Sequence, residues 1–157
     1  MKIKLFVIGK TNIEYLKIGE NEYENRLKHY CNFEEIIITD VKKGSKLSKN
    51  ELKIREGDLI LKNINSIDKV ILLDNKGKNN SSNEFSYFLK ENMLHSTKNL
   101  VFIIGGAYGF SEKVYNRANN KLSLSKMTFS HQMVRLIFKE QLYRAFTIIK
   151  GEKYHNK

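Results

Sequence analysis

The sequence predicts an α/β domain built on a largely parallel β-sheet. Strand-like apolar runs alternate with helix-like segments about five times along the 157 residues. The runs at 69–74 (KVILLD) and 99–104 (NLVFII) are apolar without alternating polar positions, as in strands that are covered on both faces. Repeated strand–helix units with such central strands are typical of a parallel sheet flanked by helices.

The first half of the chain is expected to contain two strands and two helices. Thr11 is followed three positions later by Glu14, the spacing of a capping box, and this predicts the start of a helix. A second helical segment follows a basic loop that contains glycine and serine. The expected elements are a strand at 2–9, a helix from Thr11, a strand at 33–40, the basic loop at 42–48 and a helix at 49–64.

The second half continues the alternation and ends in a long helix. The expected elements are a strand at 69–74, a polar loop at 75–83, a helix at 84–94, a strand at 99–104, a helix capped by Ser111 and running to about 119, a strand and loop at 121–129, and a helix at 131–149. No linker or repeat interrupts this order, so we expect one domain over 1–157. Ligands of parallel sheets bind beyond the carboxyl ends of the strands, which directs attention to the loops after Leu73, Ile104 and Leu124.

The composition indicates a basic protein without membrane spans. The net charge of +11 and the pI near 9.6 favour a polyanionic partner such as nucleic acid, although a Lys- and Asn-rich chain without proline also results from biased genome composition. Cys31 is the only cysteine, so no internal disulfide can form. No apolar run approaches the roughly 18 residues of a membrane span, and the apolar start is too short for a signal peptide. We therefore expect a soluble, cytoplasmic protein.

Two glycine patterns and the histidines do not match common motifs. Gly9 precedes Lys-Thr as in a P-loop, but the glycine that the motif requires five positions earlier is replaced by Lys4. The run 105–109 has the spacing GGxxG rather than GxGxxG, so it indicates either a tight turn or a close approach of a ligand to the backbone. The histidines lack metal-ligand spacing, and we expect no metal site; they are His29, His95, His131 and His155.

The last helix carries two apolar stripes and many basic residues. A core-like rhythm connects Val134, Ile137, Phe138, Gln141, Leu142, Ala145, Phe146 and Ile149, and a narrower stripe consists of Met133, Leu136 and Tyr143. A helix that is apolar on two sides is either deeply buried or shared with a second copy of the chain. The basic residues fit either a solvated face or a phosphate-contacting surface; they are Arg135, Lys139, Arg144, Lys150, Lys153 and Lys157.

Three segments together resemble one known family. They are VFIIGGAYGFS (101–111), LSLSKMTFSHQMVRLIFKEQLYRAF (122–146) and the terminal GEKYHNK (151–157), supported by VILLDNKGK (70–78). With these segments the chain closely resembles, over essentially its whole length, the ribosomal large-subunit pseudouridine N3-methyltransferases of the knotted SPOUT superfamily. The resemblance implies an α/β SPOUT-type fold, with a parallel sheet flanked by helices and a C-terminal deep trefoil knot.

The same resemblance implies an activity and its partners. The family acts as a homodimer, binds S-adenosyl-L-methionine in the knot, and methylates N3 of a pseudouridine in the helix-69 stem-loop of 23S rRNA. Because the chain has no separate RNA-binding module, the resemblance implies recognition within the assembled ribosome. No step of this reaction is expected to require a metal.

The resemblance also assigns residues. It places cofactor contacts on Leu73, Gly105, Leu124, Ser125, Lys126, Met127, Thr128 and Phe129, all of which follow expected strand ends. It places substrate binding or catalysis on Arg144, Tyr154 and His155. The N3 nitrogen must lose a proton before it can attack a methyl group, and His155 or Asp74 is a chemically reasonable base. His131 is an alternative group for orienting the knot loop.

Two other functions are open at this point. The first is a methyltransferase of the same fold that acts on transfer RNA. The second is a non-catalytic ribosome-binding factor, against which the intact IGG, LSLSKMTF and YH segments argue.

Overall fold

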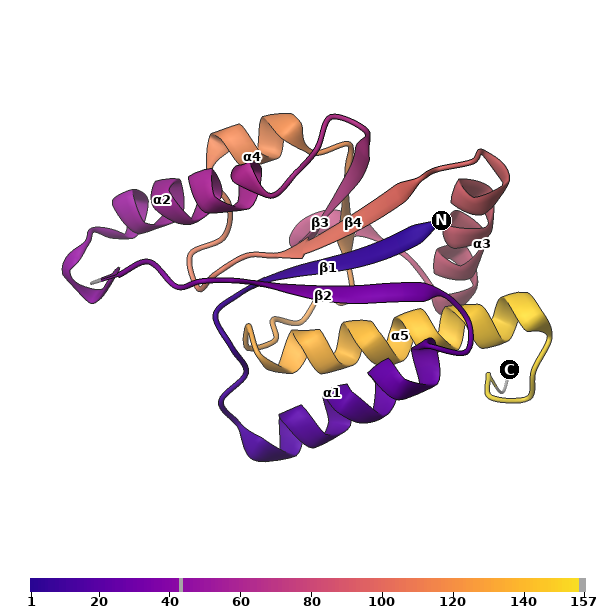
Figure 1. Cartoon of the computed structure of the whole chain (residues 1–157). Helices are drawn as coiled ribbons and strands as arrows, with labels where there is room; N and C mark the ends of the chain where they lie inside the picture. Colours follow the sequence, from indigo (N-terminus) through magenta and orange to yellow (C-terminus); the bar gives the residue numbers. More distant parts are fainter. Residues whose placement is uncertain (43, 156–157) are drawn as a thin grey trace.

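A computed structural model of the chain describes residues 1–42 and 44–155. Figure 1 shows a β-sheet with helices on both faces. All strand pairs are parallel, and the strand order is β2-β1-β4-β3-β5. The strands are β1 (Lys2–Ile8), β2 (Asn32–Ile38), β3 (Asp68–Asn79), β4 (Asn99–Ile104) and β5 (Asn120–Ser123). The α-helices are α1 (Glu14–Leu27), α2 (Lys49–Lys62), α3 (Ser82–Leu94), α4 (Glu112–Arg117) and α5 (Met133–Lys150). The predicted parallel α/β architecture is confirmed.

The sheet separates two hydrophobic cores. Alternate residues of each strand point to opposite faces, so Leu5 of β1 faces one core and its neighbour Phe6 faces the other. Helices α1, α3 and α5 cover the first face, and α2 and α4 cover the second (Figure 1). The central strand β4 is buried along almost its whole length, as its unbroken apolar run predicted.

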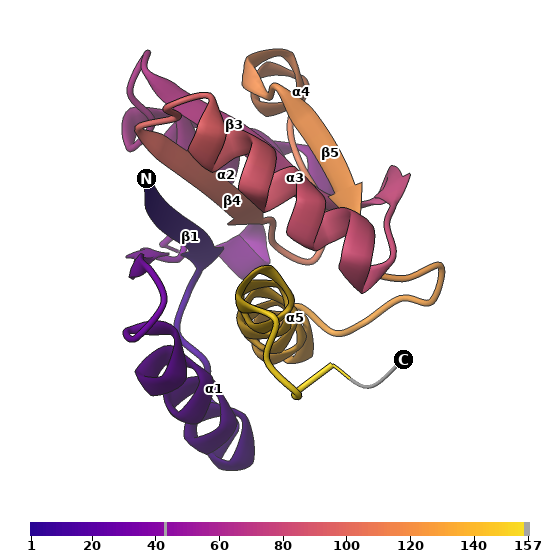
Figure 2. The same ribbon diagram turned by 90° about the vertical axis from the view of Figure 1, so that its right-hand side faces the viewer.

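Helix α5 lies between α1 and α3, which explains its two apolar stripes. Figure 2 shows α5 in this position, close to end-on. Phe138 and Leu142 face the sheet core, whereas Tyr143 packs against Tyr23 and Tyr30 of the α1 region. The second stripe is therefore covered by the same chain, at least in part, and does not by itself indicate a dimer.

Two basic residues of α5 are buried, so their interpretation as phosphate contacts is wrong. Arg135 donates hydrogen bonds to the carbonyl oxygens of Ile8 at 2.6 Å and Gly9 at 2.9 Å. Lys139 is completely buried, and its ammonium group lies 2.5–2.7 Å from carboxylate oxygens of Glu20, Glu24 and Glu35. Both charges are satisfied inside the protein, as burial requires. Of the other basic residues of this set, Lys157 lies outside the described residues.

Several element boundaries differ from the prediction. Helix α1 begins at Glu14 without a side-chain cap, because the Thr11 hydroxyl donates instead to Glu20. Complete capping boxes occur at the starts of α2 and α3.

No helix of the described ranges is long and apolar enough to cross a membrane.

Strand β3 continues to Asn79 instead of ending at Asp74. Its pairing with β5 shifts between Leu73 and Lys78, which both align with Leu122. Gly77 lies within this irregularity, and a Cβ atom there would lie 2.6 Å from backbone atoms of Leu122. Residues 75–79 are polar and lack the apolar pattern on which the prediction depended, so this part of the strand was predicted as a loop.

Candidate functional site

A cavity of about 400 Å³ opens at the carboxyl ends of β3, β4 and β5. Its volume lies in the range typical of small-molecule sites. The walls are formed by residues 73–75, where the apolar part of β3 ends, by the turn after β4, by the loop after β5 and by the first turn of α5. The lining residues are Leu73, Asp74, Asn75, Ile104, Gly105, Gly106, Ala107, Gly109, Phe110, Ser123, Leu124, Ser125, Met127, Thr128, Phe129, Ser130, His131 and Val134.

The first wall is the turn that follows β4. The N–H of Gly109 donates to the carbonyl oxygen of Gly106 at 3.2 Å, and the positive φ of Gly109 (77°) is one that glycine adopts without strain. Phe110 is buried and anchors the turn. A Cβ atom on Gly106 would lie 2.5 Å from Oε2 of Glu56, so this glycine allows the backbone to pass over a buried side chain.

The second wall is the end of the apolar part of β3. The carboxylate of Asp74 accepts hydrogen bonds from the Tyr115 hydroxyl and from the backbone N–H of Lys76, the latter at 2.8 Å. Burial, together with the bond to Asp74, raises the pKa of Tyr115 to about 12. The phenol therefore remains a donor at neutral pH and holds Asp74 in place.

The third wall is the loop from Ser123 to the start of α5. The Ser123 hydroxyl donates to the carbonyl oxygen of Ser125 at 2.8 Å, and the Ser125 hydroxyl accepts the N–H of Met127 at 2.9 Å. The Ser130 hydroxyl accepts the N–H of Met133 at 3.2 Å and helps to begin α5. These short-range bonds fold the loop onto itself and direct both apolar and polar groups toward the cavity.

Seven of the eight residues predicted to contact a cofactor line the cavity. They are Leu73, Gly105, Leu124, Ser125, Met127, Thr128 and Phe129; Lys126 is exposed and does not line it. The lining residues that were not predicted are Asn75, Ile104, Gly106, Ala107, Gly109, Phe110, Ser123, Ser130 and Val134. For most of them, a position at or soon after the end of an expected strand was the available signal. Asp74 and His131, considered for other roles, also lie in the lining.

Arg144, Tyr154 and His155 do not lie at the cavity. Arg144 follows the cavity-lining Val134 by ten residues, about 15 Å along α5. Figure 1 shows that α5 runs from the carboxyl edge of the sheet toward the opposite edge, where the C-terminal segment follows. One copy of the chain therefore keeps these three residues apart from its own cavity.

Arg144 and Tyr154 form a separate polar cluster around Glu140, and His155 follows Tyr154 directly in the chain. Arg144 binds Glu140 at 2.5 Å, and its guanidinium lies 4.7 Å from the centroid of the Tyr154 ring. The Tyr154 hydroxyl contacts Glu140 at 3.1 Å and Tyr23 at 3.2 Å. Burial, followed by the bond to Tyr23, raises the pKa of Tyr154, so the phenol stays protonated. Nδ1 of His155 is buried without a hydrogen-bond partner among the described residues.

The one acidic group with metal-ligand spacing in the described part of the chain consists of Glu20, Glu24 and Glu35. The ammonium of Lys139 occupies the centre of this group. The three carboxylates thus neutralise a buried lysine and leave no space for a cation.

Comparisons with known proteins agree with the fold. The sequence profile described as "Predicted SPOUT methyltransferase" matches residues 1–155. "Ribosomal RNA large subunit methyltransferase H" of Christiangramia forsetii is 54% identical over 157 residues, which cover 100% of both chains. The protein of the same name from Parabacteroides distasonis is 54% identical over 156 residues, 99% of each chain.

Among solved structures, the fold is similar to "a probable methylase family protein" from Haemophilus influenzae. The TM-score is 0.50 at 12% identity, over 97% of this chain and 67% of that one. The match to the profile over almost the whole sequence, and the relatives that align from end to end, identify the family. The chain therefore belongs to the SPOUT methyltransferase family.

Proposed function

We propose that this protein transfers a methyl group from S-adenosyl-L-methionine to N3 of a pseudouridine in helix 69 of 23S rRNA. The observation that carries the proposal is the 54% identity, over the full length of both chains, to a protein named as a large-subunit ribosomal RNA methyltransferase. The cavity at the carboxyl ends of three adjacent parallel strands supplies a place for the donor.

The cavity fits the methyl donor of SPOUT methyltransferases, S-adenosyl-L-methionine. Leu73, Leu124 and Phe129 offer apolar walls for an adenine ring. The carboxylate of Asp74 offers acceptors for hydroxyl or ammonium groups. The backbone of Gly105 and Gly106 lines the cavity and offers N–H and carbonyl groups to a ligand. When bound, the donor supplies an activated methyl group on a sulfonium.

The protein must align the acceptor nitrogen and help to remove its proton. N3 of pseudouridine lies between two carbonyl groups, and its lone pair becomes available only when the proton leaves. We propose His155 as the base, supported by its Nδ1 atom, which has no hydrogen-bond partner among residues 1–42 and 44–155. The oxygens of Asp74 already accept hydrogen bonds from Tyr115 and Lys76. We therefore assign this carboxylate to holding a ligand and not to removing the N3 proton. Arg144 would stabilise negative charge on the neighbouring carbonyl oxygen.

The separation of this cluster from the cavity supports a homodimer. Because α5 keeps Arg144 about 15 Å from the cavity wall, we propose that Arg144, Tyr154 and His155 of one copy complete the cavity of the other. We also propose the trefoil knot that the family resemblance implies, with the loop from Leu124 to Phe129 as part of it.

Methyl transfer to purified ribosomes tests the proposed function. Labelled S-adenosyl-L-methionine is incubated with the protein and with ribosomes from a strain that lacks the modification, with free 23S rRNA or with bulk tRNA. We expect label on a single pseudouridine of the large-subunit RNA, located by mass spectrometry, and strongest transfer with assembled ribosomes in keeping with a cytoplasmic enzyme. Label in tRNA would show that tRNA, and not 23S rRNA, is the substrate. If the protein neither transfers a methyl group nor binds the donor, it is a non-catalytic ribosome-binding factor.

A further inference from the structure

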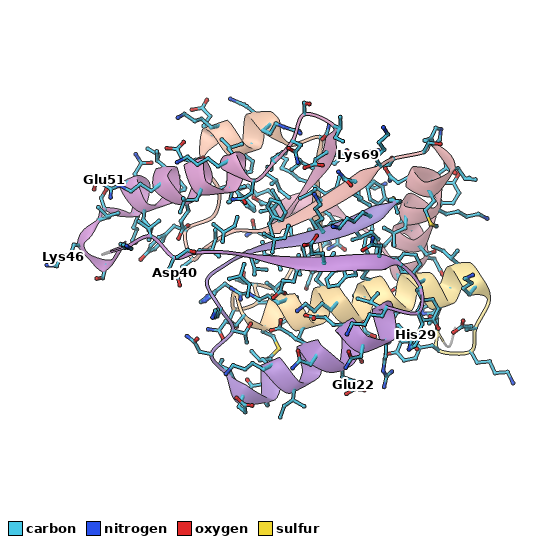
Figure 3. All side chains as sticks on the ribbon, viewed as in Figure 1. Glu22, His29, Asp40, Lys46, Glu51 and Lys69 are labelled. Carbon is cyan, nitrogen blue, oxygen red and sulfur yellow. The ribbon has the colours of Figure 1, made fainter. Side chains whose placement is uncertain are left out.

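Three exposed lysines gather at the same edge of the sheet as the cavity. Lys42 follows β2, Lys46 lies in the short 3₁₀ turn η1 (Gly44–Lys46), and Lys49 begins α2. Figure 3 shows Lys46 at the far end of this segment, beyond the carboxyl ends of the strands. This location places positive charge on the side from which a large substrate would approach the cavity.

The three lysines are not neutralised within the described part of the chain, where no carboxylate lies within 4 Å of their ammonium groups. The nearby carboxylate of Glu51 accepts the backbone N–H of Ser48 in the α2 capping box. Among the described residues, no ion pair joins Glu51 or Asp40 to these lysines. The lysines are therefore available to an anionic partner.

An aromatic ring links this basic segment to the cavity. Tyr108 lies in the turn after β4, and its neighbours Ala107 and Gly109 line the cavity although Tyr108 does not. Its side chain is 47% exposed. The ammonium of Lys49 lies 5.5 Å from the centroid of the Tyr108 ring. A rigid turn thus holds an exposed ring between the lysines and the cavity.

We infer that Lys42, Lys46, Lys49 and Tyr108 form a landing surface for unpaired RNA, on which Tyr108 stacks a base next to the target nucleotide while the lysines contact phosphates. The inference rests on the proposed function, since it assumes an RNA substrate at the cavity. Exposed rings beside unpaired lysines match single-stranded nucleic acid, which presents a base face and a phosphate at every step. An acidic protein surface would match the lysines but would leave the ring without a partner.

The salt dependence of binding tests the lysines. The triple variant Lys42→Ala, Lys46→Ala, Lys49→Ala is compared with Lys28→Ala, Lys90→Ala, Lys98→Ala, which removes the same charge from exposed positions near the opposite edge of the sheet. Binding to unmodified large ribosomal subunits is measured at several salt concentrations. A plot of log K for binding against log salt concentration has a negative slope. We expect this slope to become less steep by about 2 for the first triple variant, as for three lost phosphate contacts, and by clearly less for the second. Donor binding should remain unchanged in both.

Substitution of the ring tests the stacking contact. Tyr108→Ala is expected to weaken binding to the subunit about tenfold, within the range for one stacked base, whereas Tyr108→Phe keeps the affinity. Tyr87→Ala removes a comparably exposed ring from α3 and should have no effect. A photo-crosslinking amino acid at position 108 is expected to attach to rRNA.

Specific results would overturn the inference without affecting the proposed function. If the wild type methylates its pseudouridine but both triple variants show the same slope, the lysines are not the landing surface. Crosslinks from position 108 to a ribosomal protein instead of rRNA would likewise overturn it. If methylation occurs on another RNA, the proposed substrate is wrong, and the same measurements on that RNA decide the inference.

Discussion

The hydroxyl of Tyr115 donates a hydrogen bond to Oδ2 of Asp74 in the wall of the cavity. Tyr115→Phe removes this donor and keeps the ring that packs edge-on against Phe110. Since a hydrogen bond to a charged group contributes about 1.5 kcal/mol, we expect the substitution to weaken binding of S-adenosyl-L-methionine about tenfold. Calorimetric titration checks this value.

The exposed Tyr87 of α3 provides the matched control. Tyr87→Phe should leave the affinity for the donor unchanged. Unchanged affinity in Tyr115→Phe would show that Asp74 does not need its partner in order to bind the ligand.

Lys139 is expected to act in folding rather than in RNA binding. Its removal leaves Glu20, Glu24 and Glu35 without their shared cation. Breaking a buried ion pair in this way typically costs about 3–5 kcal/mol, so we expect Lys139→Met to lower the free energy of unfolding by that amount in urea denaturation. Lys150→Met, at an exposed position of the same helix, should change it little. A stable Lys139→Met protein with weakened RNA binding would contradict the internal role.

Glu35 is expected to make stability depend on pH. Burial raises its pKa from the ordinary value of 4.5, although Lys139 opposes the shift. The folded state then binds more protons than the unfolded state above that value, so the free energy of unfolding decreases as pH rises through the raised pKa. Glu56 is shifted in the same direction by burial and by the charge of Asp40.

We expect Glu35→Gln to flatten this decrease. Urea denaturation from about pH 5 to about pH 8 measures the slope for each protein. Glu34→Gln, which changes an exposed carboxylate on the same strand, should keep the slope of the wild type. A slope that rises with pH in the wild type would be opposite in sign to the one predicted.

Gly77→Ala is expected to be strongly destabilising. The added Cβ would lie 2.6 Å from backbone atoms of Leu122, and backbone cannot move aside as a flexible side chain can. We expect a loss of more than about 2 kcal/mol in urea denaturation, as for other overpacked positions, together with loss of donor binding. Gly151→Ala meets no atom within 4 Å but has a φ of 71°, and should cost only about 1 kcal/mol. Equal effects of the two substitutions would disprove the proposed clash.

Mixed dimers test whether the two copies share a site. Arg144→Ala removes the proposed substrate contact, and Gly105→Trp places a bulky side chain against Phe110 in the cavity wall, so each variant alone should be inactive. When the two are co-expressed, half of the dimers are mixed and each has one intact composite site, which gives about a quarter of the wild-type activity per subunit. If each chain uses only its own residues, the mixture stays inactive.

The sequence predicted the elements whose patterns are local. The apolar run of β4 predicted its bounds correctly at Asn99–Ile104. The residues after Leu73, Ile104 and Leu124 meet at the cavity as expected, although those after Leu73 belong to β3 and not to a loop. The first feature follows from the hydrophobic pattern of one segment. The second follows from a general rule of sheet topology that applies once the strands have been located in the sequence.

Features that depend on long-range contacts were not accessible in this way. Arg135 and Lys139 have the spacing of a solvated helix face, and only their partners on β1, α1 and β2 reveal that they are buried. Thr11 has the spacing of a capping residue, but Glu20 competes for its hydroxyl. Lys126 belongs to a loop that otherwise lines the cavity, and the direction of a single loop side chain is not encoded in spacing.

Arg135 on the last helix bonds the end of the first strand across 127 positions of sequence. During synthesis β1 is made well before α5, so a nascent chain that still lacks α5 has neither this bond nor the wall of the cavity that Val134 supplies. Contacts of such sequence separation also slow folding. The protein thus acquires its binding site only after α5 has been synthesised and has packed against β1.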